Sequence, residues 1–174
     1  LDWRFTAWAK YPNHQLDDAV PKQLNKKYKL RRVQPMHKGK RVVLEGGSID
    51  VNGKGTLLTT EECLLSKIQC RNPGFRREDY EAVFEKYLGI KQVIWLGDGI
   101  VGDDTDGHVD DLSRFYSPTG IVTAVESNPR DANYAPLKIN RERLRGLRTS
   151  TGREFKIVEL PMPAPCFCAG QRLP

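Results

Sequence analysis

The sequence predicts an α/β fold in which β-hairpins alternate with helices. Residues 92–96 are of strand length and contain four consecutive apolar residues at 93–96, which is typical of a buried strand. Residues 77–88 carry apolar side chains at helical i, i+3 and i+4 spacing, and Gly89 follows as a helix stop. Asn52-Gly53 indicates a tight hairpin turn. A doubly wound nucleotide fold is not expected, because no Gly-x-Gly-x-x-Gly follows a strand.

The other segments complete the order strand, hairpin strand, helix, strand, strand, strand, helix, strand. A helix is also expected over 17–27, before the first strand, with Asp17 as its N-cap. The remaining predicted elements are a strand over 42–44, hairpin strands over 49–51 and 55–60, a bulged strand over 109–116, a strand over 121–125, a helix over 133–147, a strand over 155–160 and a loop over 161–174.

Length and composition indicate a soluble, globular protein. The chain has 174 residues, which is enough for one domain with a hydrophobic core. Apolar residues make up 39% and charged residues 29% of the sequence. No apolar run approaches the roughly 18 residues of a membrane span. The first residues lack the pattern of a signal peptide, so we expect a cytoplasmic protein without a membrane partner.

The four cysteines are expected to be reduced and structural. Their spacing, Cys-x6-Cys for Cys63 and Cys70 and Cys-x-Cys for Cys166 and Cys168, fits no common zinc template. Two disulfides are the alternative, but nothing else in the sequence indicates secretion.

The formal net charge is +6, and basic residues concentrate over 22–41 and 141–148. Such patches can bind phosphate backbones. No base-reading or base-stacking motif accompanies them, which favours a solvated strand edge and a solvated helix face. We therefore expect no nucleic-acid partner, and a non-enzymatic basic binding module stays as an alternative.

The segment 103–110, here called the acidic loop, holds four aspartates and His108. So much like charge is destabilising unless a cation lies nearby. Residue type alone leaves three interpretations: a divalent metal site, a catalytic acid/base beside carboxylates that hold a cationic substrate, or a solvated loop with capping aspartates. The calcium-loop form of the metal interpretation fails, because Phe115 stands where the loop needs Glu.

Two other segments are candidates for a site. Glu45 stands at a predicted strand end before Gly46-Gly47, where the backbone can turn sharply; an ordinary turn is the alternative. Trp3 and Trp8 belong to an aromatic opening that could line a site for an alkyl guanidinium; ordinary core aromatics are the alternative.

Four motifs taken together resemble the agmatine deiminases and the related bacterial peptidylarginine deiminases. They are Val-Leu-Glu-Gly-Gly-Ser-Ile at 43–49, residues 55–65, Val-Ile-Trp-Leu at 93–96, and Asp-Thr-Asp-Gly-His-Val-Asp at 104–110. The opening 2–8 is similar to the family's aromatic stretch, with Thr6 in place of Asn. The resemblance runs almost from end to end of the chain.

The resemblance implies a five-bladed α/β propeller of the guanidine-modifying (pentein-like) superfamily. Residues 1–174 would be a single incomplete catalytic domain with about two to three blades. The implied reaction hydrolyses the guanidinium of agmatine to the ureido group of N-carbamoylputrescine and releases ammonia through a covalent cysteine intermediate. Peptidyl-arginine is the alternative substrate, no cofactor or metal is implied, and a homo-oligomer stays open.

By motif, His108 is the catalytic general acid/base and Glu45 orients it, so we expect the two side chains within about 5 Å. Asp110 binds the guanidinium with its carboxylate. Further substrate-binding candidates are Asp104, Asp106, Trp3 and Trp8. The family nucleophile lies in a Gly-Gly-Asn-Ile-His-Cys stretch that these 174 residues lack. We therefore expect the chain to be inactive by itself.

Overall fold

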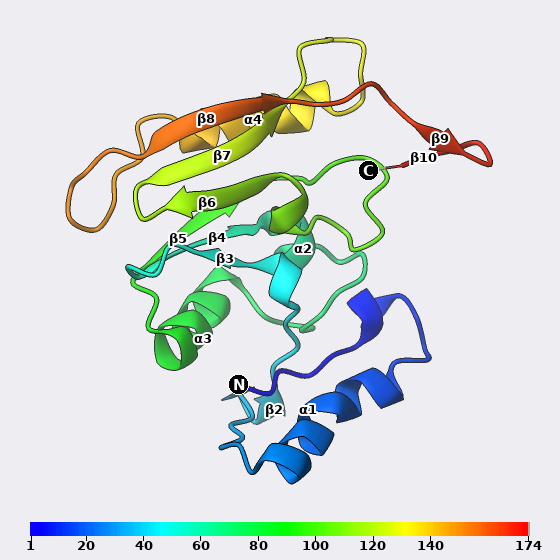
Figure 1. Cartoon of the computed structure of the whole chain (residues 1–174), viewed down its shortest axis with the longest axis vertical. Helices are drawn as coiled ribbons and strands as arrows, with labels where there is room; N and C mark the ends of the chain where they lie inside the picture. The colour runs from blue at the N-terminus through cyan, green and yellow to red at the C-terminus, as the bar shows by residue number, and fades with distance from the viewer. Residues whose placement is uncertain (174) are drawn as a thin grey trace.

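The structure, a computed structural model, describes residues 1–173 (Figure 1). Two three-stranded sheets form its centre, and each has a helix between its second and third strands in the chain. The predicted α/β class is confirmed. None of the helices formed by residues 1–173 has the length and apolar character of a membrane span.

The first sheet has the strand order β3-β4-β5. β3 (Asp50–Val51) pairs antiparallel with β4 (Thr56–Thr60) around the predicted hairpin turn. β4 pairs parallel with β5 (Gln92–Leu96). The connection between β4 and β5 contains α2 (Glu61–Leu65) and α3 (Arg77–Leu88). The predicted helix over 77–88 and strand over 92–96 are thus confirmed with their predicted bounds.

The second sheet repeats the design of the first. β6 (Ser113–Ser117) pairs antiparallel with β7 (Gly120–Val125), and β7 pairs parallel with β8 (Lys156–Pro161). The connection between β7 and β8 contains α4 (Tyr134–Leu144). Both sheets are therefore built from one unit: an antiparallel hairpin, a helical connection and a parallel third strand.

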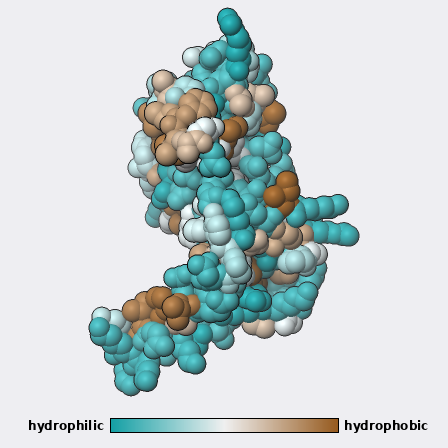
Figure 2. Space-filling view, turned by 90° about the vertical axis from the view of Figure 1, so that its right-hand side faces the viewer, coloured by the Kyte–Doolittle hydropathy of each residue, from teal (hydrophilic) through white to brown (hydrophobic). Residues whose placement is uncertain are grey.

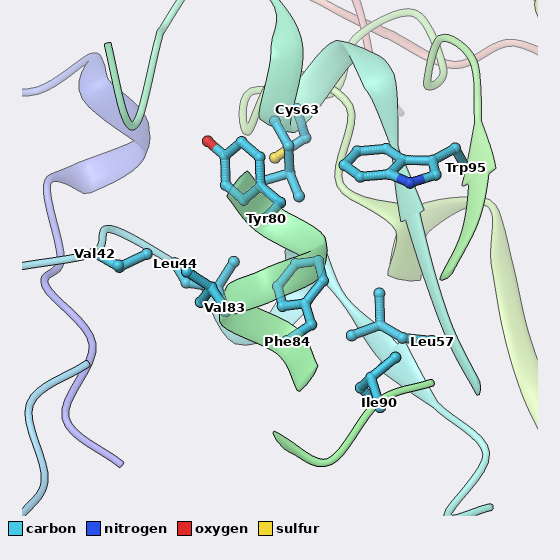
Figure 3. Close-up of a cluster of buried hydrophobic side chains, with 10 residues drawn as sticks. Val42, Leu44, Leu57, Cys63, Tyr80, Val83, Phe84, Ile90 and Trp95 are labelled. Carbon is cyan, nitrogen blue, oxygen red and sulfur yellow. The ribbon is translucent and has the colours of Figure 1, made fainter. Parts of the chain in front are cut away.

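The first core cluster lies between α3 and one face of the first sheet (Figure 3). Tyr80 and Phe84 of α3 pack with Leu57 of β4 and with Trp95 of β5. The helix ends at Gly89, whose φ of 69° is the left-handed conformation that favours glycine. Apolar periodicity on α3 therefore matches an observed buried face.

The second core cluster joins the two sheets. Leu58 faces away from Leu57 because successive strand residues point to opposite faces, and it packs with Ile121 of β7 and Leu137 of α4. Val109 and Leu112 add to this cluster from the segment that follows His108. The end of the acidic loop is therefore anchored in the core between the sheets.

The N-terminal region contains η1 (Ala7–Ala9), α1 (Gln15–Tyr28) and the short hairpin of β1 (Met36–His37) and β2 (Lys40–Arg41). α1 extends the predicted helix by a few residues and buries none of its side chains. Figure 2 shows an apolar patch on the projection that this region forms. The exposed apolar residues on α1 and in the turn after it are Leu16, Val20, Leu24, Tyr28 and Leu30.

Two segments predicted as strands, 42–44 and 109–116, are not regular strands over their predicted lengths. Val42 to Leu44 are buried, but only a single parallel bridge joins Val43 to Arg4. The Asn72 side chain takes the place of a strand partner: its Oδ1 accepts the Val43 N–H (2.9 Å) and its Nδ2 donates to the Val43 carbonyl (2.8 Å). The segment 109–116 begins as a 3₁₀ turn, and its strand starts only at Ser113.

The remaining predictions differ in smaller ways. The predicted helix over 133–147 is the shorter α4. The predicted loop at 161–174 contains a small hairpin of β9 (Phe167–Cys168) and β10 (Gln171–Arg172), while residue 174 lies outside the described residues.

Many basic side chains of the two basic segments form ion pairs within the chain. Arg41 contacts Asp2 and Asp18, and Lys38 contacts Asp79. The other basic side chains of these segments with an acidic partner are Arg32, Arg141, Arg143 and Arg148. These pairings reduce the charge that the segments offer to a phosphate backbone.

Candidate active site

Glu45 is held at the start of a short 3₁₀ turn, η2 (Gly46–Ser48). The Ser48 hydroxyl donates to the Glu45 carbonyl (2.6 Å), and the Thr59 hydroxyl of β4 donates to the Ser48 carbonyl (2.8 Å). These bonds fix the turn against the first sheet, so the Glu45 carboxylate has a defined and buried position.

The acidic loop folds around the carboxylate of Asp103. This carboxylate accepts the backbone N–H groups of Thr105 (2.7 Å), Gly107 (2.8 Å) and His108 (3.1 Å). Gly107 has a φ of 85°, and the Thr60 hydroxyl donates to its carbonyl. Asp103 is thus a structural residue that sets the position of His108.

The structure brings His108 and Glu45 together. His108 Nε2 lies 3.3 Å from Glu45 Oε2, within the separation that we expected, and both residues are buried. On the other side of the ring, Nδ1 lies 3.8 Å from Asp110 Oδ1. Asp110 belongs to the 3₁₀ turn η3 (Val109–Asp111), so a turn and not an extended strand places the two side chains together.

Gly47 leaves the space that this arrangement needs. A Cβ atom at Gly47 would lie 2.5 Å from His108 Nδ1 and 2.8 Å from Asp110 Oδ1. Any side chain at this position would therefore displace both groups. At Gly46 a Cβ atom would meet nothing within 4 Å, so the two glycines of the motif have different roles.

Arg71 is the buried cation of the site. Its Nε donates to Glu45 Oε2 (3.2 Å) and its Nη1 to the Gln69 carbonyl (3.1 Å). Its Nη2 donates to the Thr105 carbonyl, and Nη1 lies 3.7 Å from Asp106 Oδ2. The side chain is fully buried and joins Glu45 to the acidic loop.

Arg71 was not among the residues predicted for the site. The loop 69–73 has no periodic pattern, and its partners at Glu45 and Thr105 are distant in the sequence. The available signal was the acidic loop itself, because clustered carboxylates require a nearby cation. That requirement predicts a cation but does not say which of the 28 lysines and arginines supplies it.

Burial raises the pKa of the Asp106 carboxyl, and the charge of Arg71 partly offsets this rise. The backbone of Asp106 is left-handed, with a φ of 65°. Its buried Oδ2 has no hydrogen-bond partner among residues 1–173. The Asp106 Oδ2 atom is therefore buried beside Arg71 without accepting a hydrogen bond from the described residues.

Residues 5–11, here called the aromatic segment, lie beside the acidic loop. Ala7, Trp8 and Ala9 all have positive φ angles, which is a strained conformation for residues other than glycine. The Trp8 ring contacts Phe5 (5.7 Å between centroids) and Tyr11 (6.0 Å) edge to face. An open hollow of about 570 Å³ is lined by Phe5, Ala7, Trp8, Tyr11, Asn13 and Asp17.

Asp104 joins the aromatic segment to the acidic loop. The Tyr11 hydroxyl donates to Asp104 Oδ2 (2.7 Å), and the Lys10 ammonium forms an ion pair with Oδ1. These contacts lower the pKa of the Asp104 carboxyl, with the Lys10 hydrogen bond as the main cause, and the same bond raises the pKa of Lys10.

Trp3 is placed differently from the other predicted site residues. It packs against the first core cluster, with its ring edge to face with Tyr87 (6.0 Å between centroids). Among residues 1–173, no hydrogen bond or aromatic contact joins the Trp3 side chain to Glu45 or His108. Its position matches the alternative of an ordinary core aromatic.

Glu45, Cys63 and His108 offer ligand atoms that lie within 4.8 Å of one another. Carboxylate, thiolate and imidazole are suitable ligands for zinc. The positive charge of Arg71, 3.2 Å from the same carboxylate, opposes a further buried cation. The group is therefore better described as a carboxylate–imidazole pair balanced by arginine.

Cys63 is expected to be unreactive. Its side chain belongs to the first core cluster (Figure 3), and burial raises the pKa of its thiol far above the usual range. Limited treatment of the native protein with iodoacetamide should alkylate the exposed Cys166 and Cys168 and leave Cys63 unmodified, as read by peptide mass spectrometry. Unfolding in urea should expose it, and equal labelling of all three in the native protein would contradict this assignment.

The chain is similar to known deiminases over its whole length. A family model described as Porphyromonas-type peptidyl-arginine deiminase matches residues 1–174. An agmatine deiminase of Pseudomonas fluorescens is 38% identical over 98% of this chain and 47% of its own length. Thus the chain spans about half the length of the curated relatives it matches.

Solved structures agree with this similarity. An agmatine deiminase from C. jejuni, solved with substrate bound, is 36% identical, with a TM-score of 0.82 over 98% of this chain and 48% of that one. An agmatine deiminase of Enterococcus faecalis is 34% identical, with a TM-score of 0.82 over 93% of this chain and 44% of that one. Sequence and fold therefore lead to one conclusion: the chain belongs to the Porphyromonas-type peptidyl-arginine deiminase family.

Proposed function

We propose that the protein containing this chain is an agmatine deiminase, which hydrolyses the guanidinium of agmatine to a ureido group and releases ammonia. The observation that carries the proposal is the buried contact between His108 and Glu45, with Asp110 on the other side of the imidazole ring. A histidine held by carboxylates is suited to proton transfer, and a carboxylate is suited to binding the planar guanidinium.

In this proposal a cysteine thiolate attacks the guanidinium carbon and forms a covalent intermediate. His108 protonates the departing ammonia and then takes a proton from the water that releases the product. Glu45 orients the imidazole through Nε2. Asp110, whose side chain is partly exposed, accepts hydrogen bonds from the guanidinium.

Asp106, Asp104 and Trp8 are proposed to complete the substrate site. The buried Oδ2 of Asp106, which lies 3.7 Å from Arg71 and accepts no hydrogen bond from residues 1–173, is proposed as a further acceptor for the guanidinium. Trp8 offers an aromatic face beside the hollow, which suits the aliphatic part of an alkyl guanidine. Asp104 lies at the contact between the acidic loop and the aromatic segment and would face the far end of the substrate.

The nucleophile is proposed to come from outside these 174 residues. Cys63 is buried and belongs to the first core cluster, and none of the other three cysteines lies in a Gly-rich segment that ends in His-Cys. The repeated unit of hairpin, helix and parallel strand supports an assignment of residues 1–174 to part of a five-bladed propeller. In this proposal the two sheets are two of the two to three blades expected for these residues.

Peptidyl-arginine is the second candidate substrate, because the matching family model is described by that activity. The two substrates differ at the far end of the alkyl guanidine: agmatine ends in an ammonium, whereas the arginine of a peptide ends in uncharged amides. A comparison of both ligands on one preparation separates the two proposals.

The expected result for the 174-residue chain is binding of agmatine without turnover. Calorimetric titration should show binding of agmatine and none of putrescine, which lacks the guanidinium. Asp110→Asn should weaken agmatine binding by about 10- to 100-fold, because a hydrogen-bonded ion pair is lost. An ammonia assay on the same samples should stay at background.

Two outcomes would contradict this proposal. Equal binding of agmatine and putrescine would show that the guanidinium is not recognised. Release of ammonia that His108→Ala abolishes would show that the chain has its own nucleophile.

A further inference from the structure

The aromatic segment reaches the acidic loop through the charge of Lys10. The Lys10 ammonium forms an ion pair with Asp104 Oδ1, while Tyr11 donates to Oδ2. Both carboxylate oxygens of Asp104 are therefore occupied by groups of the chain itself. The Lys10 and Asp104 side chains are 38% and 54% exposed, so water or a ligand can reach and replace this contact.

Asp104 lies close to the proposed reaction centre. It precedes His108 by four residues, which can span at most about 14 Å. The loop is folded around Asp103 and tied to Glu45 by Arg71, so the real separation is shorter than that of an extended chain. A short alkyl chain that starts beside His108 can therefore end near Asp104.

Lys10 presents to Asp104 the same chemical group that agmatine carries at its far end. A lysine side chain is a primary ammonium on four methylene groups, and agmatine joins its guanidinium to a primary ammonium through four methylene groups. Two ammonium groups at one carboxylate repel each other and share its charge. A guanidine with an uncharged tail does not meet this competition.

We propose that Lys10 is a specificity-determining residue, which lowers the affinity for guanidines with a cationic tail relative to guanidines with an uncharged tail. The inference rests on the proposed function, because it requires the guanidinium to bind beside His108. Exposed ion pairs are weak, so the expected effect of Lys10 is a factor of about 2 to 5 in relative affinity.

The test compares two ligands of equal length on the 174-residue chain. Agmatine and n-butylguanidine are titrated calorimetrically against the wild-type chain and Lys10→Met. The variant should bind agmatine about 2- to 5-fold more tightly and n-butylguanidine unchanged. Lys22→Met on α1 is the matched control, because it removes one positive charge and should leave the ratio of the two affinities unchanged.

A double variant identifies the partner of Lys10. In the Asp104→Asn background, Lys10→Met should change the affinity ratio less than in the wild type, because the carboxylate for which both ammonium groups compete is gone and only their mutual repulsion remains. Retention of the full change in this background would overturn the role of Asp104 and with it the inference.

The other outcomes are also decisive. An unchanged ratio in Lys10→Met, or an equal loss of affinity for both ligands, would overturn the inference and leave the proposed function standing. If the folded wild-type chain, checked by circular dichroism, binds neither guanidine, the proposed function fails and the Lys10 inference fails with it.

Discussion

Replacing Arg71 by Met should lower the free energy of unfolding by about 3–5 kcal/mol. The substitution leaves the Glu45 carboxylate buried without its cationic partner. It also removes the donors to the carbonyls of Gln69 and Thr105. Urea denaturation followed by circular dichroism measures this change, because the loss is large compared with the error of the linear extrapolation.

Two variants act as controls for Arg71. Arg114→Met removes an exposed arginine that lies 3.2 Å from Asp50, and it should cost no more than about 1 kcal/mol. Arg71→Lys keeps the charge but loses the planar fork, so its stability should fall between those of the wild type and Arg71→Met. A loss of 1 kcal/mol or less in Arg71→Met would contradict the role of Arg71 as the central buried cation.

Gly47→Ala is expected to weaken ligand binding as strongly as Asp110→Asn. The new Cβ atom would lie 2.5 Å from His108 Nδ1 and 2.8 Å from Asp110 Oδ1, so these side chains must move. Loss of one hydrogen bond to the charged guanidinium weakens binding by about 10- to 100-fold. Calorimetry with agmatine measures the affinity, and the imidazole NMR signals of His108 report the displacement without a ligand.

Gly46→Ala is the matched control, since a Cβ atom at Gly46 meets nothing within 4 Å. This variant should keep the agmatine affinity within about 2-fold, as expected for a substitution away from the site. Similar losses in both variants would mean that the turn tolerates no side chain at all. In that case the close approach at Gly47 would not explain its effect.

The parts of the fold that the sequence predicts correctly depend on local signals. The helix 77–88 has apolar residues at helical spacing, and the strand 92–96 contains four consecutive apolar residues. Gly89 ends the helix in the left-handed conformation. The hairpin at Asn52-Gly53 follows from turn chemistry that involves only adjacent residues. The strands predicted over 121–125 and 155–160 match β7 and β8 within one residue at each end, so the main strands of both sheets were predictable.

The parts that local signals miss depend on distant partners. The segment 42–44 has the composition of a strand, but the Asn72 side chain satisfies the backbone of Val43 in place of a neighbouring strand. The segment after His108 was predicted as a bulged strand, but it forms a 3₁₀ turn whose Val109 and Leu112 enter the core between the sheets. The shared design of the two sheets could not be predicted either, because the repeat lies in the backbone topology and not in the residue pattern.

The candidate site was predictable only in part. Residue types alone did not decide whether the acidic loop is a metal site, a catalytic acid/base or a solvated loop. The resemblance to a family selected His108, Glu45 and Asp110. The structure brings these three together. It adds Arg71, because a contact over 26 residues of sequence has no local pattern. It also packs the partly buried Trp3 against the first core cluster, away from Glu45 and His108.

The two halves of the candidate site are anchored in different cores. Glu45 follows Leu44 of the first cluster, whereas His108 precedes Val109 of the second. A subglobal opening between the sheets would therefore separate the imidazole from its carboxylate while α3 and the first sheet stayed intact. A core substitution at the contact between the two sheets, far from Glu45 and His108, is therefore expected to alter the geometry of the site.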